Sequence, residues 1–132
     1  MKRYIIFSLL AVQFYSCSNG TIPPNQVQSP NGKISVNFVM VDGKAHYNVC
    51  YNDHQVLQNS QLGIIREDGN FSNNLSLTSN SKMESVHEEY VLLHGKKQKA
   101  VYDANRKTFH LSNISGDQIN IIFQVSDDGV AF

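Results

Sequence analysis

Side chains that could bind a metal or carry out catalysis are spread along this 132-residue chain without forming a recognised motif. The segment His87-Glu88-Glu89-Tyr90-Val91 begins like a metalloprotease zinc helix, but valine stands where that motif requires a second histidine. The other histidines also lack a partner at a metal-ligand spacing: His46, His54, His94 and His110. We therefore predict that this chain binds no metal and no cofactor.

Two pairs of adjacent carboxylates, Glu88-Glu89 and Asp127-Asp128, are the other candidates for acid–base chemistry. Neighbouring side chains on a strand point to opposite faces, so one pair cannot supply both the acid and the base of a glycosidase. Such pairs more often cap turns or face solvent. The sequence also contains no phosphate-binding loop, nucleophile elbow or dinucleotide-binding glycine motif. We therefore predict no catalytic residue in this chain.

Aromatic residues are the candidates for ligand binding, because the face of an aromatic ring accepts the apolar face of a sugar. Five residues could stack in this way: Tyr47, Tyr51, Phe71, Tyr90 and Tyr102. We select Tyr47, Tyr51 and Tyr90 as candidate ligand-binding residues. The alternative for each is packing in the core or against a neighbouring strand. A basic cluster is predicted to be a solvated edge that blocks strand addition: Lys96, Lys97, Lys99, Arg106 and Lys107.

The elements that would carry these residues are all predicted to be strands. Ile34, Val36 and Phe38 alternate with polar residues, and Asp42-Gly43 is a strong signal for a two-residue hairpin turn. Further strands are predicted at residues 44–51, 55–57, 75–79, 85–93, 98–102, 108–111 and 119–126. Turn signals recur about every eight to twelve residues, and no helical periodicity is sustained. The sequence therefore predicts an all-β fold, either an antiparallel β-sandwich or a large antiparallel sheet.

The last strand determines how the end of the sequence is interpreted. Ile119, Ile121, Phe123 and Val125 alternate, while Ile122 breaks the pattern and predicts a stretch covered on both faces. Asp127-Asp128-Gly129 forms a turn, and Val130-Ala131-Phe132 starts a second apolar run. Three apolar residues need a surface on which to be buried, so we expect this sequence to be part of a longer protein whose next strand starts at Val130 and is cut before it can pair.

The first 17 residues are predicted to be an export signal. Met1-Lys2-Arg3 is positively charged, and the apolar run Tyr4–Val12 is too short to span a membrane. Ser16-Cys17 resembles the end of a bacterial lipoprotein signal, which predicts lipidation of Cys17 and a periplasmic or outer-membrane, cell-surface location. The alternative is ordinary cleavage that leaves Cys17 as a thiol or in a disulfide with Cys50. Residues 18–28 are predicted to be a polar tether, and residues 29–132 the folded domain.

Composition limits the classes of partner. Removing Lys2 and Arg3 with the leader leaves 9 basic residues of 11 against 11 acidic ones, a net charge of −2. This balance supplies no positive field for nucleic acid. A surface that is polar but weakly charged suits neutral ligands such as sugars, and contact with a membrane is expected only through the lipid anchor.

Several short segments occur in the order found in one enzyme family: Ser29-Pro30-Asn31-Gly32-Lys33-Ile34, Tyr47-Asn48-Val49-Cys50-Tyr51, Gln61-Leu62-Gly63-Ile64, Val86-His87-Glu88-Glu89-Tyr90 with His94-Gly95-Lys96, and Phe123 to Phe132. Together they resemble the start of the N-terminal domain of bacterial glycoside hydrolase family 97, a family of α-glucosidases and α-galactosidases. The resemblance covers about residues 29–132. It implies a β-super-sandwich, similar to galactose mutarotase and incomplete at its C-terminus, packed against a catalytic (β/α)8 barrel.

The resemblance assigns catalysis and calcium binding to positions outside this sequence. In the family the catalytic carboxylates lie in the barrel, and calcium is held mainly by barrel glutamates with help from a later part of the N-terminal domain. We therefore expect an inactive fragment of an enzyme acting on α-glucosides or α-galactosides, in which this domain shapes one wall of the sugar pocket. The alternatives are a stand-alone carbohydrate-binding lipoprotein and a structural or interaction β-domain. Sugar preference and the inverting or retaining mechanism stay open.

Overall fold

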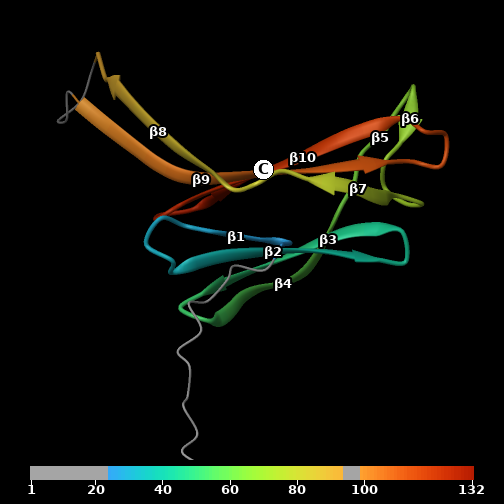
Figure 1. Ribbon diagram of the computed structural model, residues 1–132, viewed down its shortest axis with the longest axis horizontal. Helices are drawn as coiled ribbons and strands as arrows, with labels where there is room; N and C mark the ends of the chain where they lie inside the picture. Colours follow the sequence, from blue (N-terminus) through green and yellow to red (C-terminus); the bar gives the residue numbers. More distant parts are fainter. Residues whose placement is uncertain (1–23, 94–98) are drawn as a thin grey trace, which may run out of the picture.

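The structure, a computed structural model, describes residues 24–93 and 99–132. Within these ranges every regular element is a strand, and no helix is long and apolar enough to cross a membrane. Figure 1 shows two main layers, with strands β1 to β4 in one and β7 to β11 in the other. The predicted all-β, antiparallel sandwich is confirmed.

The first sheet contains four antiparallel strands in chain order: β1 (Gln26–Gln28), β2 (Ile34–Val41), β3 (Lys44–Tyr51) and β4 (His54–Leu62). Two-residue turns join β2 to β3 and β3 to β4. Asp42 and Gly43 have φ angles of 49° and 71°, and Asn52 and Asp53 have 48° and 64°. These left-handed conformations match the twist of a tight hairpin and suit Asp, Asn and Gly. The hairpin predicted at Asp42-Gly43 is confirmed.

The second sheet has the order β11-β10-β9-β7, with β8 also paired to β9. Its strands are β7 (Ser76–Asn80), β8 (Glu84–Val91), β9 (Lys99–Ser112), β10 (Gln118–Ser126) and β11 (Val130–Ala131), and a small separate ribbon pairs β5 (Ile65–Arg66) with β6 (Gly69–Asn70). The prediction of two strands at 98–102 and 108–111 was wrong. Residues 103–106 looked like a turn, but each of them pairs with a residue of β8, so β9 is one continuous strand.

Strand β4 is also longer than the predicted segment 55–57. The register between β3 and β4 shifts on both sides of Val49, which marks bulges or irregularities. A bulge disturbs the alternation of side chains, so the polar sequence Gln58–Gln61 shows no clear strand pattern although it belongs to β4.

The core lies between the two sheets and centres on three phenylalanines. Phe38 of β2 stacks on Phe109 of β9, with ring centroids 4.3 Å apart. Phe123 of β10 meets the edge of Phe109 at 6.0 Å. All three side chains are buried. Such aromatic packing joins the layers by burying apolar area and through favourable ring geometry.

The sandwich begins before the predicted boundary at residue 29. Gln26–Gln28 pairs with Ser35–Asn37 as strand β1, and Val27 is fully buried in the core. The last three residues of the expected tether therefore belong to the folded domain. Residues 18–23, like the leader, lie outside the described residues.

Three side-chain expectations are corrected by the structure. Lys107, predicted to lie on a solvated edge, is only 7% exposed. Ile122, predicted to lie in a stretch covered on both faces, is 46% exposed. The apolar run at Val130 was expected to lack a pairing partner, but Val130 and Ala131 pair with β10 and Phe132 packs near Phe123 with ring centroids 5.7 Å apart.

Candidate functional site

A two-stranded arm extends from the second sheet beyond the sandwich (Figure 1). Strand β8 pairs with β9 from Lys99 to Arg106, whereas β10 pairs with β9 only from Ala104 onward. We call residues 84–93 with 99–103 the arm. The side chains of β8 are almost all exposed, so the arm offers both of its faces to other molecules.

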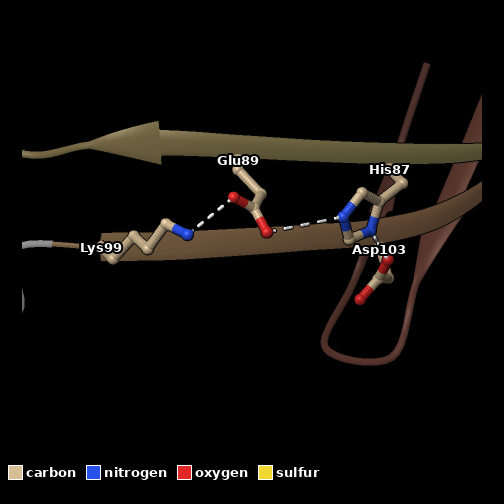
Figure 2. Close-up of polar contacts among 4 residues, drawn as sticks. All are labelled: His87, Glu89, Lys99 and Asp103. Atoms are coloured by element: carbon tan, nitrogen blue, oxygen red, sulfur yellow. Dashed lines mark hydrogen bonds and ion pairs between the residues drawn. The ribbon is translucent and has the colours of Figure 1, made fainter.

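One face of the arm carries a row of charged side chains, shown in Figure 2. Lys99 Nζ lies 2.8 Å from Glu89 Oε2, and His87 Nε2 lies 3.9 Å from Glu89 Oε1. His87 Nδ1 lies 2.6 Å from Asp103 Oδ1. The hydrogen bond and charge of Asp103 raise the pKa of His87 above its ordinary value of 6.5. All four side chains are well exposed, so the row is expected to add little to the stability of the fold.

Within residues 24–93 and 99–132, no hydroxyl or thiol is hydrogen-bonded to the His87 ring. Among the described residues, His87 contacts only the two carboxylates of Asp103 and Glu89. A nucleophile activated by this histidine would need its hydroxyl or thiol within hydrogen-bonding distance of the ring. The row is therefore best described as a pH-sensitive surface network.

The same face carries apolar side chains toward the end of the arm. Val91 and Val101 on this face are exposed, and Leu93, two residues beyond β8, is 91% exposed. Several exposed aliphatic residues at the end of a projecting element are typical of a surface that another polypeptide covers.

An apolar cleft of about 340 Å³ opens where the two sheets have free edges. Strand β11 covers β10 only at Gln124 and Val125, so the earlier part of β10 has no strand neighbour on that side within the described chain. Strand β4 is likewise an edge of the first sheet. Residues from both sheets and the loops between them line the cleft: Leu62, Ile64, Phe71, Ile119, Ile121 and Phe132. Free edges beside apolar residues can accept further chain by strand pairing.

The three tyrosines selected from the sequence lie in different environments. Tyr47 is half-buried, with its ring 5.6 Å from that of Phe123 and 5.1 Å from that of Phe132. Tyr51 lies at the end of β3 and is exposed. Tyr90 lies on β8 in the other sheet and is 48% exposed. The structure therefore does not bring Tyr90 together with Tyr47 in one site.

Tyr102 was considered but not selected from the sequence, and the structure gives it two polar neighbours, Glu88 and Gln124. Tyr102 lies on the arm beside Glu88, its partner in the strand register, and its hydroxyl accepts a hydrogen bond from Gln124 Nε2 at 3.2 Å. Their proximity depends on the register between β8, β9 and β10. Only recognition of β9 as one continuous strand would have indicated it.

The described residues do not fit a calcium site. Within 24–93 and 99–132 no three His, Cys, Asp or Glu side chains gather as metal ligands. Cys50 is half-buried in β3. Cys17, the predicted lipidation site, lies outside the described residues, as do Lys96 and Lys97 of the basic cluster.

Comparisons with known proteins identify the family of this domain. Residues 27–132 match the family described as glycosyl-hydrolase 97 N-terminal. A solved β-arabinopyranosidase superposes with a TM-score of 0.72 and 33% identity, over 77% of this chain and 16% of that protein. A family 97 enzyme from Pseudoalteromonas sp. strain K8, solved with panose and with acarbose, gives 0.72 and 25%, over 80% of this chain and 16% of its own.

No curated protein matches the chain. The chain spans about one sixth of the length of the solved proteins that it matches, with 16% of each covered. Because the family match extends over residues 27–132, nearly the whole described sandwich, the chain belongs to the N-terminal domain family of glycoside hydrolase family 97.

Proposed function

We propose that this chain forms the first part of the N-terminal support domain of a family 97 glycoside hydrolase and packs against the catalytic (β/α)8 barrel. The observation that carries this proposal is the family match over residues 27–132 combined with coverage of only 16% of the solved enzymes. A domain of this kind contributes to catalysis by holding the barrel and by closing one side of its sugar pocket.

Two surfaces of the chain support a packing role. The cleft between β4 and β10 is lined by apolar side chains, and its strand edges are free within the described residues. The charged face of the arm also carries the exposed Val91 and Val101, and the exposed Leu93 follows just beyond β8. Apolar area of this kind is stabilised by burial against another part of a protein.

The substrates of the whole enzyme are proposed to be α-glucosides or α-galactosides. The solved relatives are named as a β-arabinopyranosidase and as an enzyme in complex with panose and acarbose, which supports a glycoside substrate. Calcium would be held by residues outside this chain, since the donor set described here does not fit it. Exposed Tyr51 and Tyr90 are the candidates for contact with sugar, whereas the ring of Tyr47 packs against Phe123 and Phe132.

We also propose export and anchoring through a lipid on Cys17, which would place the enzyme in the periplasm or on the outer membrane. The sequence pattern of residues 1–17 supports this proposal. Incorporation of labelled palmitate by the full chain, lost in Cys17→Ala, tests it. Equal labelling of both proteins, or of neither, contradicts it.

The DNA that follows codon 132 tests the main proposal. An open reading frame that continues into a barrel of alternating strands and helices would support the proposal that this chain belongs to an N-terminal support domain. A stop codon with no family 97 barrel encoded beside it contradicts the proposal. The purified chain provides a second test, because it should not hydrolyse nitrophenyl α-glucoside or α-galactoside, and measurable turnover that persists after repurification would place a catalytic site within these residues.

A stand-alone carbohydrate-binding lipoprotein is the second candidate function. It is favoured by the core, since Phe38, Phe109 and Phe123 are buried without any further strand. A cooperative thermal melt that shifts upward with a malto-oligosaccharide would support it. Concentration-dependent self-association without sugar binding would favour a structural or interaction domain only together with a stop codon and no barrel, because a support domain purified without its barrel would also expose apolar surface.

A further inference from the structure

The face of the arm opposite the charged row carries two tyrosines in a defined arrangement. Glu88 pairs with Tyr102, and Tyr90 pairs with Ala100, so all four side chains lie on this face. Tyr90 and Tyr102 are then diagonal neighbours across two strands, about 7–8 Å apart at their Cα atoms. The aromatic pairs of the described residues all join core or C-terminal rings, and none joins these two.

Tyr90 is poorly covered by its own hairpin. Its partner across the strands is Ala100, whose methyl group cannot cover an aromatic ring. Tyr90 is 48% exposed as a result. A tyrosine whose role is to stabilise a hairpin would be expected opposite a bulky partner, because cross-strand pairs gain energy from contact. An uncovered ring is available for a ligand.

Polar groups stand beside the rings. Gln124 of β10 donates a hydrogen bond to the Tyr102 hydroxyl, which restrains that ring at the base of the arm. Glu88, the register partner of Tyr102, is exposed. Glu84 pairs with Arg106 and Glu89 with Lys99, whereas Glu88 has no ion pair within the described chain. Its carboxylate is therefore free to accept hydrogen bonds from neighbouring hydroxyl groups.

The chemistry of this face favours a neutral saccharide. Aromatic faces contact the C–H groups of a pyranose ring, while a carboxylate and an amide bind its hydroxyls. The charge of Glu88 disfavours phosphate and carboxylate ligands. We propose that Tyr90, Tyr102, Glu88 and Gln124 form a saccharide-binding patch on the arm of this domain. The patch rests on the proposed function, because it would supply the domain's contact with the oligosaccharide on which the enzyme acts.

A titration of the full chain, expressed with its leader and purified after processing, tests the patch. Amide and tyrosine ring NMR signals are followed as maltotriose or melibiose is added. We expect weak binding with shifts at Tyr90 and Tyr102. Tyr90→Ala and Tyr102→Ala should each weaken binding about tenfold, as expected for loss of one stacking ring. Tyr90→Phe should bind as the unsubstituted chain does, because it keeps the ring face.

Tyr51→Ala tests the competing candidate for contact with sugar, because Tyr51 is a similarly exposed tyrosine on the other sheet. Val56→Ala, at an exposed position of β4, is the matched control. Thermal melting of every variant checks that the sandwich is intact. Binding that depends on Tyr90 and Tyr102 but not on Tyr51 supports the patch. Absence of binding to both sugars, or binding that only Tyr51→Ala weakens, overturns it. Neither result bears on whether a barrel is encoded beyond codon 132. The proposed saccharide patch can therefore be disproved without disproving the proposed support role, and the reverse also holds.

Discussion

His87 shows how a surface charge row can respond to pH. Its pKa is raised first by the hydrogen bond to Asp103 and then by that carboxylate's charge. A group whose pKa is raised in the folded state stabilises the fold below its unfolded pKa, about 6.5, and loses this contribution as the pH rises through the folded value. Because the side chain is exposed, the effect should be local to the arm.

We therefore expect His87 to titrate above 6.5 in the folded chain, and Asp103→Asn to lower its pKa. NMR titration of the imidazole signals measures both values. Asp53→Asn is the control, because Asp53 lies in the β3–β4 turn and asparagine tolerates its φ of 64°. An unchanged His87 pKa in Asp103→Asn would show that the 2.6 Å contact is not present in solution.

Lys107 shows that charge alone does not predict exposure, because this lysine is buried. It lies on the inward face of β9 with Phe109 and Leu111, where alternation along a continuous strand puts it. Its ammonium donates a hydrogen bond to the Pro24 carbonyl at 2.5 Å and lies 5.9 Å from the Phe109 ring centroid. Burial lowers the pKa of Lys107. The burial of Lys107 could not be predicted from the sequence, because residues 103–106 have the composition of a turn and the continuity of β9 through them was missed.

Replacing Lys107 tests whether its packing or its charge matters more. The Lys107→Met variant keeps the aliphatic volume and removes a partly buried charge, so its unfolding free energy should match or slightly exceed that of the unsubstituted chain. The Lys107→Ala variant should lose about 2 kcal/mol through lost packing. Urea unfolding measures both. If both variants lose the same amount, the hydrogen bond to Pro24 is the stabilising contact instead.

Strands and turns differ in how well the sequence predicts them. The β2–β3 hairpin was predictable because Asp42-Gly43 carries its own conformational preference and flanks two alternating strands. Strand β9 was not, because Asp103-Ala104-Asn105-Arg106 has the composition of a turn and is held extended by pairing with β8. The saccharide patch and the charged row both depend on that non-local pairing, so neither could be found from local pattern.

Gly32 and Gly43 both have a left-handed backbone conformation, but only Gly43 has close neighbours. Replacing each by alanine therefore distinguishes the cost of backbone strain from that of steric contact. Gly43 has a φ of 71°, and a Cβ there would lie 3.2 Å from Asn74 Cα. Gly32 has a φ of 72° with nothing within 4 Å of its Cβ position. Gly32→Ala should cost about 1 kcal/mol from the left-handed backbone alone, and Gly43→Ala clearly more. Equal losses in urea unfolding would mean that the loop at Asn74 moves aside.

The whole molecule combines a closed core with uncovered apolar surfaces. The core phenylalanines are buried, and the sandwich that contains them matches the family 97 N-terminal domain over residues 27–132. Leu93 and Ile65 are 91% and 72% exposed. Alternation predicted the inward faces of β2 and β10, which carry Phe38 and Phe123, but not that of β9, which carries Phe109. No local pattern encodes which of these outward apolar residues the proposed barrel would cover.

These exposed residues predict how the purified chain behaves by itself. Without a covering surface, the chain should self-associate as its concentration rises, because apolar area is removed from water. Leu93→Lys combined with Ile65→Lys should reduce this association in sedimentation experiments while leaving the melting temperature nearly unchanged, since neither side chain packs in the core. Lys82→Arg, on the loop between β7 and β8, is the control: it changes an exposed side chain without changing the charge or an apolar residue, so its association should match that of the unsubstituted chain. Association that persists unchanged in the double variant would place the contact at the free edges of β4 and β10, and substitutions at those edges would then be required to separate the copies.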